Sequence, residues 1–293
     1  MATYNPFSKR ESHTRYSLGT YRVLVPLSWL LVVVAGIYYS GHAPHDVKHG
    51  HTIWKQANKH ITPFSLSTVI GGLYWVIVLL SQVGYVYHLF SNDAVVATAA
   101  ANVGSHFILN NLFVFAWILL WTRSHFWGSE IILIAHFLNQ HATYWRHRTL
   151  PAVAHFAAVA APYAWTLIAL FWNGAVAVNS NSLPARIVAN VFIWVLFALG
   201  SAHILSTQDD LLGYSLSLLT LGLAVKQFGV KIISLQWIFA IVIFAVFFAE
   251  SLYISLTKYS GRNVLFRRAG QPAAADRERE PLLHDPTQPA EST

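Results

Sequence analysis

The chain has 293 residues and a formal net charge of +7, and 55% of its residues are hydrophobic while only 11% are charged. Soluble domains carry about 25% charged residues, so this composition argues against a water-soluble protein. The basic residues gather near the two ends, which does not fit the basic face of a nucleic-acid-binding domain. The sequence contains no cysteine, which excludes disulfides, thiolate metal sites and thiol catalysis.

Eight mostly apolar stretches follow one another along the chain, each close to the ~20 residues that cross a bilayer as a helix. We predict membrane-spanning helices over 22–40, 66–90, 99–121, 128–146, 152–178, 186–206, 211–229 and 232–257. The predicted fold is therefore an all-α integral membrane bundle of about eight transmembrane helices within 22–257. Residues 1–21 are predicted to be a polar cytosolic segment, and 268–293, rich in Pro, Ala and charge, a disordered cytosolic tail.

The predicted orientation rests on the Lys and Arg residues near the span ends. An even number of spans places both termini on one side of the membrane, and that side has ten of these residues against seven on the other. Because cytosolic loops carry the excess of positive charge, we predict that both termini are cytosolic. No small-residue cleavage site follows the first apolar stretch, so we expect it to be retained as a span.

Three segments carry a resemblance to a known family. They read HITPFSLSTVIGGLYWVIVLL at 60–80, NVGSHFILNNLFVFAWILLW at 102–121 and PYAWTLIALFWNGAV at 162–176. Together, over roughly residues 55–230, they resemble the longer relatives of the tryptophan-rich sensory protein (TspO) family of translocators. The whole chain resembles fungal multi-pass membrane proteins of unknown function. The resemblance implies a helical bundle with a pocket for a flat apolar molecule such as a sterol or a porphyrin.

Polar residues recur on one face of the predicted span 128–146. His136, Gln140, Thr143 and His147 are spaced four, three and four residues apart, which places them on one helical stripe. Unpaired polar groups are expensive in hydrocarbon, so the stripe should face the bundle. It would then supply interhelical hydrogen bonds or form the polar wall of a cavity. For the cavity hypothesis the candidate ligand-binding residues are Gln82, Asn110, Asn111, His136, Gln140, Trp165 and Asn173.

Two ionisable residues, Lys226 and Glu250, lie well inside predicted spans. Intramembrane charges are functional hypotheses by default. Glu250 is expected ~12 Å from the cytosolic end of its helix at 1.5 Å per residue, whereas Lys226 lies near the opposite end of the preceding helix and should snorkel outward. We therefore expect no direct pair. Glu250 should face the bundle, with either a structural hydrogen bond or a proton or ligand role.

The first loop is rich in histidine, with His42, His45, His49 and His51 around Asp46. Imidazole and carboxylate suit Zn, Cu, Ni or Fe, and in an acidic lumen these histidines would protonate near pH ~6. A solvated loop without either role is the simpler interpretation. A membrane di-iron enzyme would need adjacent histidines, and the sequence has none. We therefore predict no enzyme, metal site or cofactor, with a histidine-dependent membrane metalloenzyme as a weak alternative.

The carboxyl-terminal tail contains EREPLL, in which Glu278 precedes Leu282 and Leu283. This segment resembles an acidic dileucine sorting signal, which predicts sorting adaptors as partners and an endosomal or vacuolar membrane, with the endoplasmic reticulum as the alternative. For the whole chain we predict binding or transport of a small hydrophobic ligand such as a sterol, a lipid or a porphyrin. The alternative is a structural or adaptor membrane protein without a ligand pocket.

Overall fold

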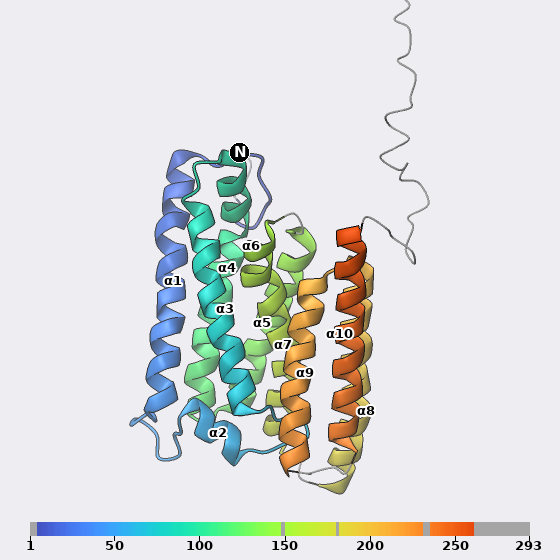
Figure 1. The fold of residues 1–293 in the computed structure, drawn as a ribbon. Helices are drawn as coiled ribbons and strands as arrows, with labels where there is room; N and C mark the ends of the chain where they lie inside the picture. Colours follow the sequence, from blue (N-terminus) through green and yellow to red (C-terminus); the bar gives the residue numbers. More distant parts are fainter. Residues whose placement is uncertain (1–4, 148–149, 180–181, 231–234, 261–293) are drawn as a thin grey trace, which may run out of the picture. The chain divides into compact units, whose positions relative to one another are not determined.

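The computed structural model describes residues 5–147, 150–179, 182–230 and 235–260 (Figure 1). The chain divides into two compact units, 1–254 and 255–293, and the helices before α10 all belong to the first. The elements are α1 (Arg15–Gly41), α2 (Ile53–Lys59), α3 (Thr68–Leu89), α4 (Ala94–Thr122), α5 (Phe126–Arg146), α6 (Ala152–His155), the π-helix η1 (Phe156–Ala160), α7 (Ala161–Ala177), α8 (Leu183–Thr207), α9 (Asp210–Val230) and α10 (Gln236–Ser260). The described residues contain no strand, which confirms the all-α class.

Each of the eight predicted spans coincides with a long helical segment. The largest difference is at the amino-terminal end, where α1 begins at Arg15 and not near residue 22. Thr14 caps this helix by accepting a hydrogen bond from the Ser17 N–H. The helix therefore begins at this cap, ahead of the apolar stretch that it contains. Within the described residues, seven helical segments are long and apolar enough to cross a membrane, which indicates a multi-pass membrane protein. The helix α5 is not among them, because polar residues line one of its faces.

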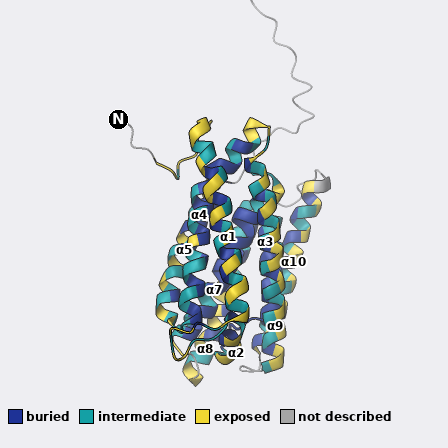
Figure 2. Cartoon of the chain, turned by 90° about the vertical axis from the view of Figure 1, so that its left-hand side faces the viewer, coloured by how far each residue is buried: buried dark blue, intermediate teal, exposed yellow. Residues whose placement is uncertain are grey.

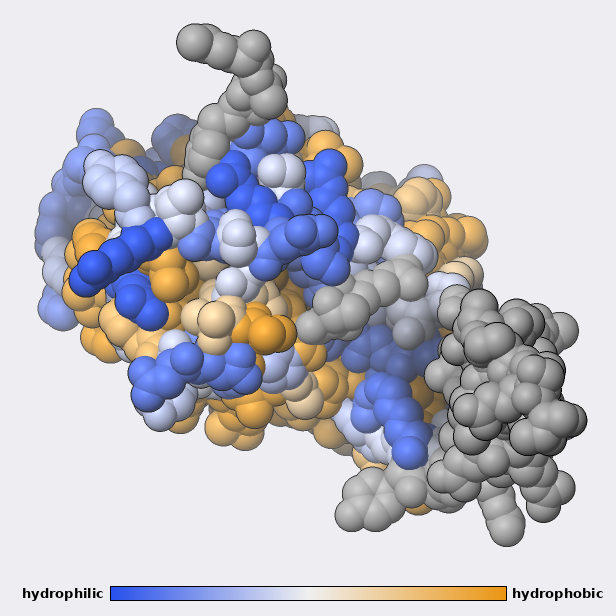
Figure 3. Space-filling view, turned by 90° about the horizontal axis from the view of Figure 1, so that it is seen from above, coloured by the Kyte–Doolittle hydropathy of each residue, from blue (hydrophilic) through white to orange (hydrophobic). Residues whose placement is uncertain are grey.

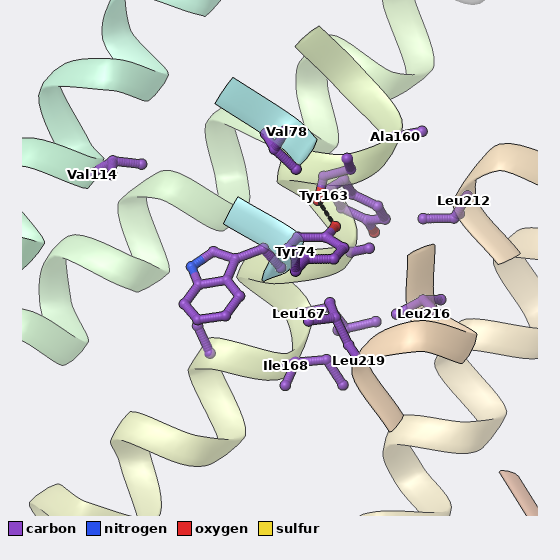
Figure 4. Close-up of a cluster of buried hydrophobic side chains, with 14 of the residues drawn as sticks. Tyr74, Val78, Val114, Ala160, Tyr163, Leu167, Ile168, Leu212, Leu216 and Leu219 are labelled. Atoms are coloured by element: carbon purple, nitrogen blue, oxygen red, sulfur yellow. Dashed lines mark hydrogen bonds between the residues drawn. The ribbon is translucent and has the colours of Figure 1, made fainter. Parts of the chain in front are cut away.

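The helix α7 lies in the interior of the bundle, and most of its residues are buried (Figure 2). It packs between α5 and α9, while α4 packs against both α1 and α5. Figure 4 shows Leu167 and Ile168 of α7 between Tyr74 of α3 and Leu216 and Leu219 of α9. The exposed large side chains of the outer helices are mostly apolar, as expected of surfaces that face lipid.

Pro162 distorts the segment that leads into α7. Proline has no N–H and clashes with the preceding turn of a helix, and here the five residues before Ala161 form the π-helix η1. Side chains of α3 compensate for the disturbed backbone. The Tyr74 hydroxyl donates to the Ala161 carbonyl at 2.7 Å, and Gln82 Nε2 donates to the Ala157 carbonyl at 3.3 Å.

The loop between the first two predicted spans contains the short helix α2, which we did not expect from the sequence. Two reciprocal contacts hold it against the end of α4. Trp121 Nε1 donates to the Ile53 carbonyl at 3.3 Å, and Gln56 Nε2 donates to the Trp121 carbonyl at 3.1 Å. Seven residues are too few to give a periodic pattern, so these tertiary hydrogen bonds add to the local cap, in which Thr52 accepts from the Lys55 N–H.

Gly213 of α9 lies close to Ser251 of α10. A Cβ atom at this position would lie 1.9 Å from the Ser251 Oγ atom, whereas a Cβ at Gly229 of the same helix meets nothing within 4 Å. We expect Gly213→Ala to destabilise the protein by about 1–3 kcal/mol through overpacking. Gly229→Ala should be neutral or slightly stabilising. Thermal unfolding of the two variants in the same detergent measures the difference, and equal melting temperatures would contradict this account.

Candidate ligand-binding site

A mostly apolar cavity of about 330 Å³ lies among α1, α2, α3, α4 and α7. We call it the tryptophan cavity. Its lining contains five indole rings, aliphatic side chains, two glycines and one serine: Val32, Val33, Gly36, Ile37, Ser40, Ile53, Trp54, Gly72, Trp75, Val76, Leu79, Val114, Trp117, Ile118, Trp165 and Trp172. This volume is at the lower end of the range of small-molecule sites, which are typically apolar with a few polar groups.

The indole rings support one another and form a rigid wall. The Trp165 ring lies 5.2 Å from the Trp75 ring in an edge-to-face arrangement. It also lies 6.2 Å from the rings of Trp117 and Trp172. Aromatic pairs at these separations stabilise one another by about 0.5–1.5 kcal/mol beyond their burial. The flat faces needed to contact a planar apolar ligand are therefore held in place without it.

The cavity reaches the surface of the bundle between α1 and α3. Ile37 and Val76 belong to its lining and are also 72% and 52% exposed, on the apolar surface that would face lipid. The two glycines leave space at this opening. A Cβ at Gly36 would meet no atom within 4 Å, and one at Gly72 would contact only the Trp54 ring, at 3.4 Å. A hydrophobic molecule could therefore enter from the side, without passing through water.

Two polar groups of the lining residues differ in their hydrogen bonding. The Ser40 hydroxyl oxygen accepts a hydrogen bond from Trp54 Nε1 at 3.0 Å, and its O–H group can donate a further hydrogen bond. Trp172 Nε1 is buried and has no hydrogen-bond partner among the described residues. A buried donor without a partner is unfavourable by about 1–3 kcal/mol. A ligand with a hydroxyl or carbonyl oxygen could satisfy it.

The seven predicted ligand-binding residues occupy different places. Trp165 lines the tryptophan cavity, and the other six, all polar, are absent from its lining. Asn110 Oδ1 accepts a hydrogen bond from His136 Nε2, and Asn111 Nδ2 donates to Ser28 Oγ at 3.1 Å. The stripe of span 128–146 faces the interior, where His136, Gln140, Thr143 and His147 are all at most 4% exposed.

Asn173 and the two glutamines complete this set. Asn173 is fully buried; it accepts from the Ser129 hydroxyl at 2.8 Å and donates to Glu130 Oε2 at 2.8 Å. Gln82 contacts the π-helix, as described above, and the amide of Gln140 has no partner among the described residues. Most of these polar side chains therefore link neighbouring elements of the bundle: α4 to α1 and α5, α7 to α5, and α3 to η1.

Lys226 and Glu250 contact different residues. Lys226 Nζ donates to Asn58 Oδ1 at 2.9 Å, at the end of the bundle where α2 lies. The Glu250 carboxyl lies beside the Ser201 hydroxyl of α8. The predicted sorting residues Glu278, Leu282 and Leu283 lie outside the described residues.

The histidine-rich loop is anchored by one ion pair at its acidic residue. Asp46 Oδ2 accepts from Arg123 Nε at 2.9 Å, and this contact lowers the pKa of Asp46. Across the described parts of the chain, no group of three or more His, Cys, Asp or Glu side chains comes close enough together to hold a metal ion.

Sequence reasoning missed four of the five rings that line the tryptophan cavity: Trp54, Trp75, Trp117 and Trp172. One signal was available, because Trp165 and Trp172 are seven residues apart and share a face of one helix. The contribution of Trp54 could not be found in this way, since α2 was not expected.

A polar cluster at the other end of the bundle joins α5, α6 and α9. Asp209 Oδ1 accepts from the N–H groups of Leu211 and Leu212, as a helix cap does. Its Oδ2 accepts from His155 Nε2 at 2.6 Å and from the Tyr144 hydroxyl at 2.7 Å. Burial would raise the pKa of Asp209, but these hydrogen bonds outweigh it and lower that pKa.

We expect Asp209→Asn to lower the free energy of unfolding by about 1.5–3 kcal/mol, because asparagine still caps the helix but loses the charged bonds to His155 and Tyr144. Asp93 caps α4 through Val95 and Val96 alone, so Asp93→Asn is the matched control and should change stability by less than about 0.5 kcal/mol. A carboxyl with a lowered pKa stabilises the fold above its unfolded pKa, and this contribution is lost as the pH falls below about 4.

Unfolding in mixed micelles at pH 7 and at pH 3 tests this account. The difference between Asp209→Asn and the unsubstituted protein should be large at pH 7 and should shrink at pH 3. A difference that does not depend on pH would show that the charge of Asp209 is not what stabilises the cluster.

Comparison with known sequences gives one similarity. Residues 186–283, which include most of α8 and all of α9 and α10, match the model of a fungal protein family of unknown function (DUF1774). No curated protein and no solved structure matches the chain. The resemblance to tryptophan-rich sensory proteins remains a prediction, and the similarity to a fungal family of unknown function is supported.

Proposed function

We propose that this protein binds a small, flat, hydrophobic ligand in the tryptophan cavity, and that its role is binding and not catalysis. The observation that carries the proposal is the wall of five indole rings beside unfilled space, open toward lipid through Gly36 and Gly72. A bundle that needed these rings only for packing would close the space, because protein interiors are normally filled to crystal-like density.

The lining favours a neutral ligand over a charged one. None of its side chains is ionisable, so the carboxylates of a porphyrin would be buried there without partners. A sterol-like molecule has a rigid apolar ring system and a single hydroxyl, which matches the single serine hydroxyl and the unpartnered Trp172 Nε1. Within the predicted set of sterol, lipid or porphyrin, we therefore propose a sterol-like ligand.

The fluorescent sterol dehydroergosterol tests this function, because it accepts energy from tryptophan. We expect the purified protein to transfer energy to the sterol saturably, and Gly36→Phe to weaken binding at least tenfold, about 1.4 kcal/mol. The added ring would occupy space that no atom fills, so the fold should be retained. Gly229→Phe, at an exposed glycine outside the lining, is the matched control and should bind normally.

Two outcomes would overturn the proposal. One is the absence of saturable transfer in the unsubstituted protein. The other is equal sterol affinity of Gly36→Phe and Gly229→Phe at unchanged melting temperature. Tighter binding of protoporphyrin than of the sterol would overturn the assignment of a neutral ligand.

We further propose that α5 is an eighth span and that both termini are cytosolic, in an endomembrane such as the vacuole, endosome or endoplasmic reticulum. The proposal is supported by the two faces of α5. Ile131, Ile134 and Leu138 are 65%, 48% and 61% exposed, as on a lipid-facing surface, while His136 and Gln140 are buried against the neighbouring helices.

The absence of native cysteine allows a direct test with single cysteines. If α5 crosses the membrane, His125→Cys, just before α5, and Ala152→Cys, at the start of α6, should react with a membrane-impermeant maleimide from opposite sides. Both positions are exposed. Ser12→Cys should share the accessibility of Ala152→Cys. Labelling of His125→Cys and Ala152→Cys from the same side would show that α5 does not cross.

An adaptor role is the second candidate, and the family similarity favours it. The matched residues 186–283 contain none of the residues that line the tryptophan cavity, but they include the predicted sorting segment with Glu278, Leu282 and Leu283. If the sterol experiment fails, recruitment of sorting adaptors by this tail becomes the leading function.

A further inference from the structure

A second cavity, of about 400 Å³, lies at the end of the bundle where α4 begins. We call it the basic cavity. Lys9, Arg10 and Glu11 of the amino-terminal arm (residues 5–14) form one side of it, and Thr98 and Asn102 of α4 lie opposite. The ring of His147, at the carboxyl-terminal end of α5, completes the polar part of the lining.

The arm is fixed in this position by a reciprocal pair of hydrogen bonds. The Arg10 N–H donates to Asn102 Oδ1 at 2.9 Å, and Asn102 Nδ2 donates to the Arg10 carbonyl at 2.9 Å. His13 Nε2 also lies 3.0 Å from Asn102 Oδ1. Because the bonds to Asn102 involve the backbone of Arg10, they place the Lys9 and Arg10 side chains at the cavity and do not depend on what those side chains are.

His147 lies at the cavity with an unsatisfied polar atom. It is 4% exposed, and its Nε2 atom has no hydrogen-bond partner among the described residues. Nε2 of His106, whose ring lies 5.6 Å away, has none either. Burial, His106, Lys9 and Arg146 lower the pKa of His147 to about 4. Of these causes, the charges of Lys9 and Arg146 would attract an anion to the ring.

We propose that the basic cavity binds the singly charged phosphodiester headgroup of an anionic lipid. Two cations and one carboxylate in the lining leave one net positive charge, which matches a phosphodiester. The unpartnered His147 ring adds a hydrogen-bonding group. Val95 and Leu150, also in the lining, give an apolar side for the glycerol region.

The position of the basic cavity fits a lipid headgroup. Figure 3, which views the end where the amino-terminal arm lies, shows hydrophilic residues gathered across this end and hydrophobic residues on the flanks below it. A headgroup at such a boundary keeps its acyl chains along the apolar flanks. Basic pockets between membrane helices are a general means of binding anionic lipid headgroups. This site is separate from the tryptophan cavity and does not depend on its ligand.

The full-length protein in neutral detergent allows the test, with phosphatidylglycerol and phosphatidylcholine of identical acyl chains as probes. We expect phosphatidylglycerol to raise the melting temperature more than phosphatidylcholine does. The double variant Lys9→Gln/Arg10→Gln should weaken phosphatidylglycerol binding at least fivefold, because it removes both cations and keeps the backbone bonds to Asn102. His147→Phe, which keeps the ring volume and removes Nε2, should also weaken it.

Lys48→Gln/Lys55→Gln, a pair of exposed lysines outside the lining, is the matched control for net charge and should bind as the unsubstituted protein does. Equal responses to the two lipids, or an equal loss in the control variant, would overturn the proposal. Inorganic phosphate distinguishes the source. If it stabilises the protein as fully as phosphatidylglycerol does, a soluble phosphate is the ligand and the lipid assignment is wrong.

Discussion

The bundle depends on burying the polar face of α5 against the neighbouring helices. Inside a membrane a polar side chain must find its partner in the protein, and α5 finds its partners on both neighbours. His106 and His136 take part in side-chain hydrogen bonds between α4 and α5, with Asn139 and Asn110 respectively. Asn173 links α5 to α7 through Ser129 and Glu130. These contacts require α5 to lie between α4 and α7, and that position fixes the rest of the arrangement.

A central α7 follows from this constraint, because the helix is closed in by α5 on one side and by α9 on another. Its small residues allow the close approach, and Ala154, Ala157 and Ala161 in the segment leading into it are fully buried. Further along the helix, the large side chains of Trp165 and Trp172 lie among further buried alanines. Their rings line the tryptophan cavity, and Gly36 on α1 and Gly72 on α3 leave space there unfilled. The tryptophan cavity thus lies where large rings of α7 and glycines of α1 and α3 line the same space.

The sequence predicted the parts of this structure that depend on composition and periodicity. The eight apolar stretches became long helices because length and hydropathy are local properties. The polar stripe of His136 and Gln140 faces inward as its spacing predicted. The spacing could not distinguish residues that line a cavity from residues that hydrogen-bond to other helices, since both arrangements give the same pattern. Trp54 and the amino-terminal arm were beyond prediction, because they are positioned by hydrogen bonds, to Ser40 and to Asn102, between separate parts of the chain.

The helix α4 connects the two candidate sites. Thr98 and Asn102 near its start belong to the basic cavity, while Val114 and Trp117 near its end belong to the tryptophan cavity. The nineteen helical steps from Thr98 to Trp117 span roughly 28 Å, which is close to the thickness of the hydrocarbon core. One cavity would therefore lie near each interface of the membrane. One lining is neutral and the other is basic, and the two surfaces of a bilayer can differ in charge in the same way. A neutral ligand in one cavity and an anionic headgroup in the other would therefore also fix the orientation and depth of the bundle.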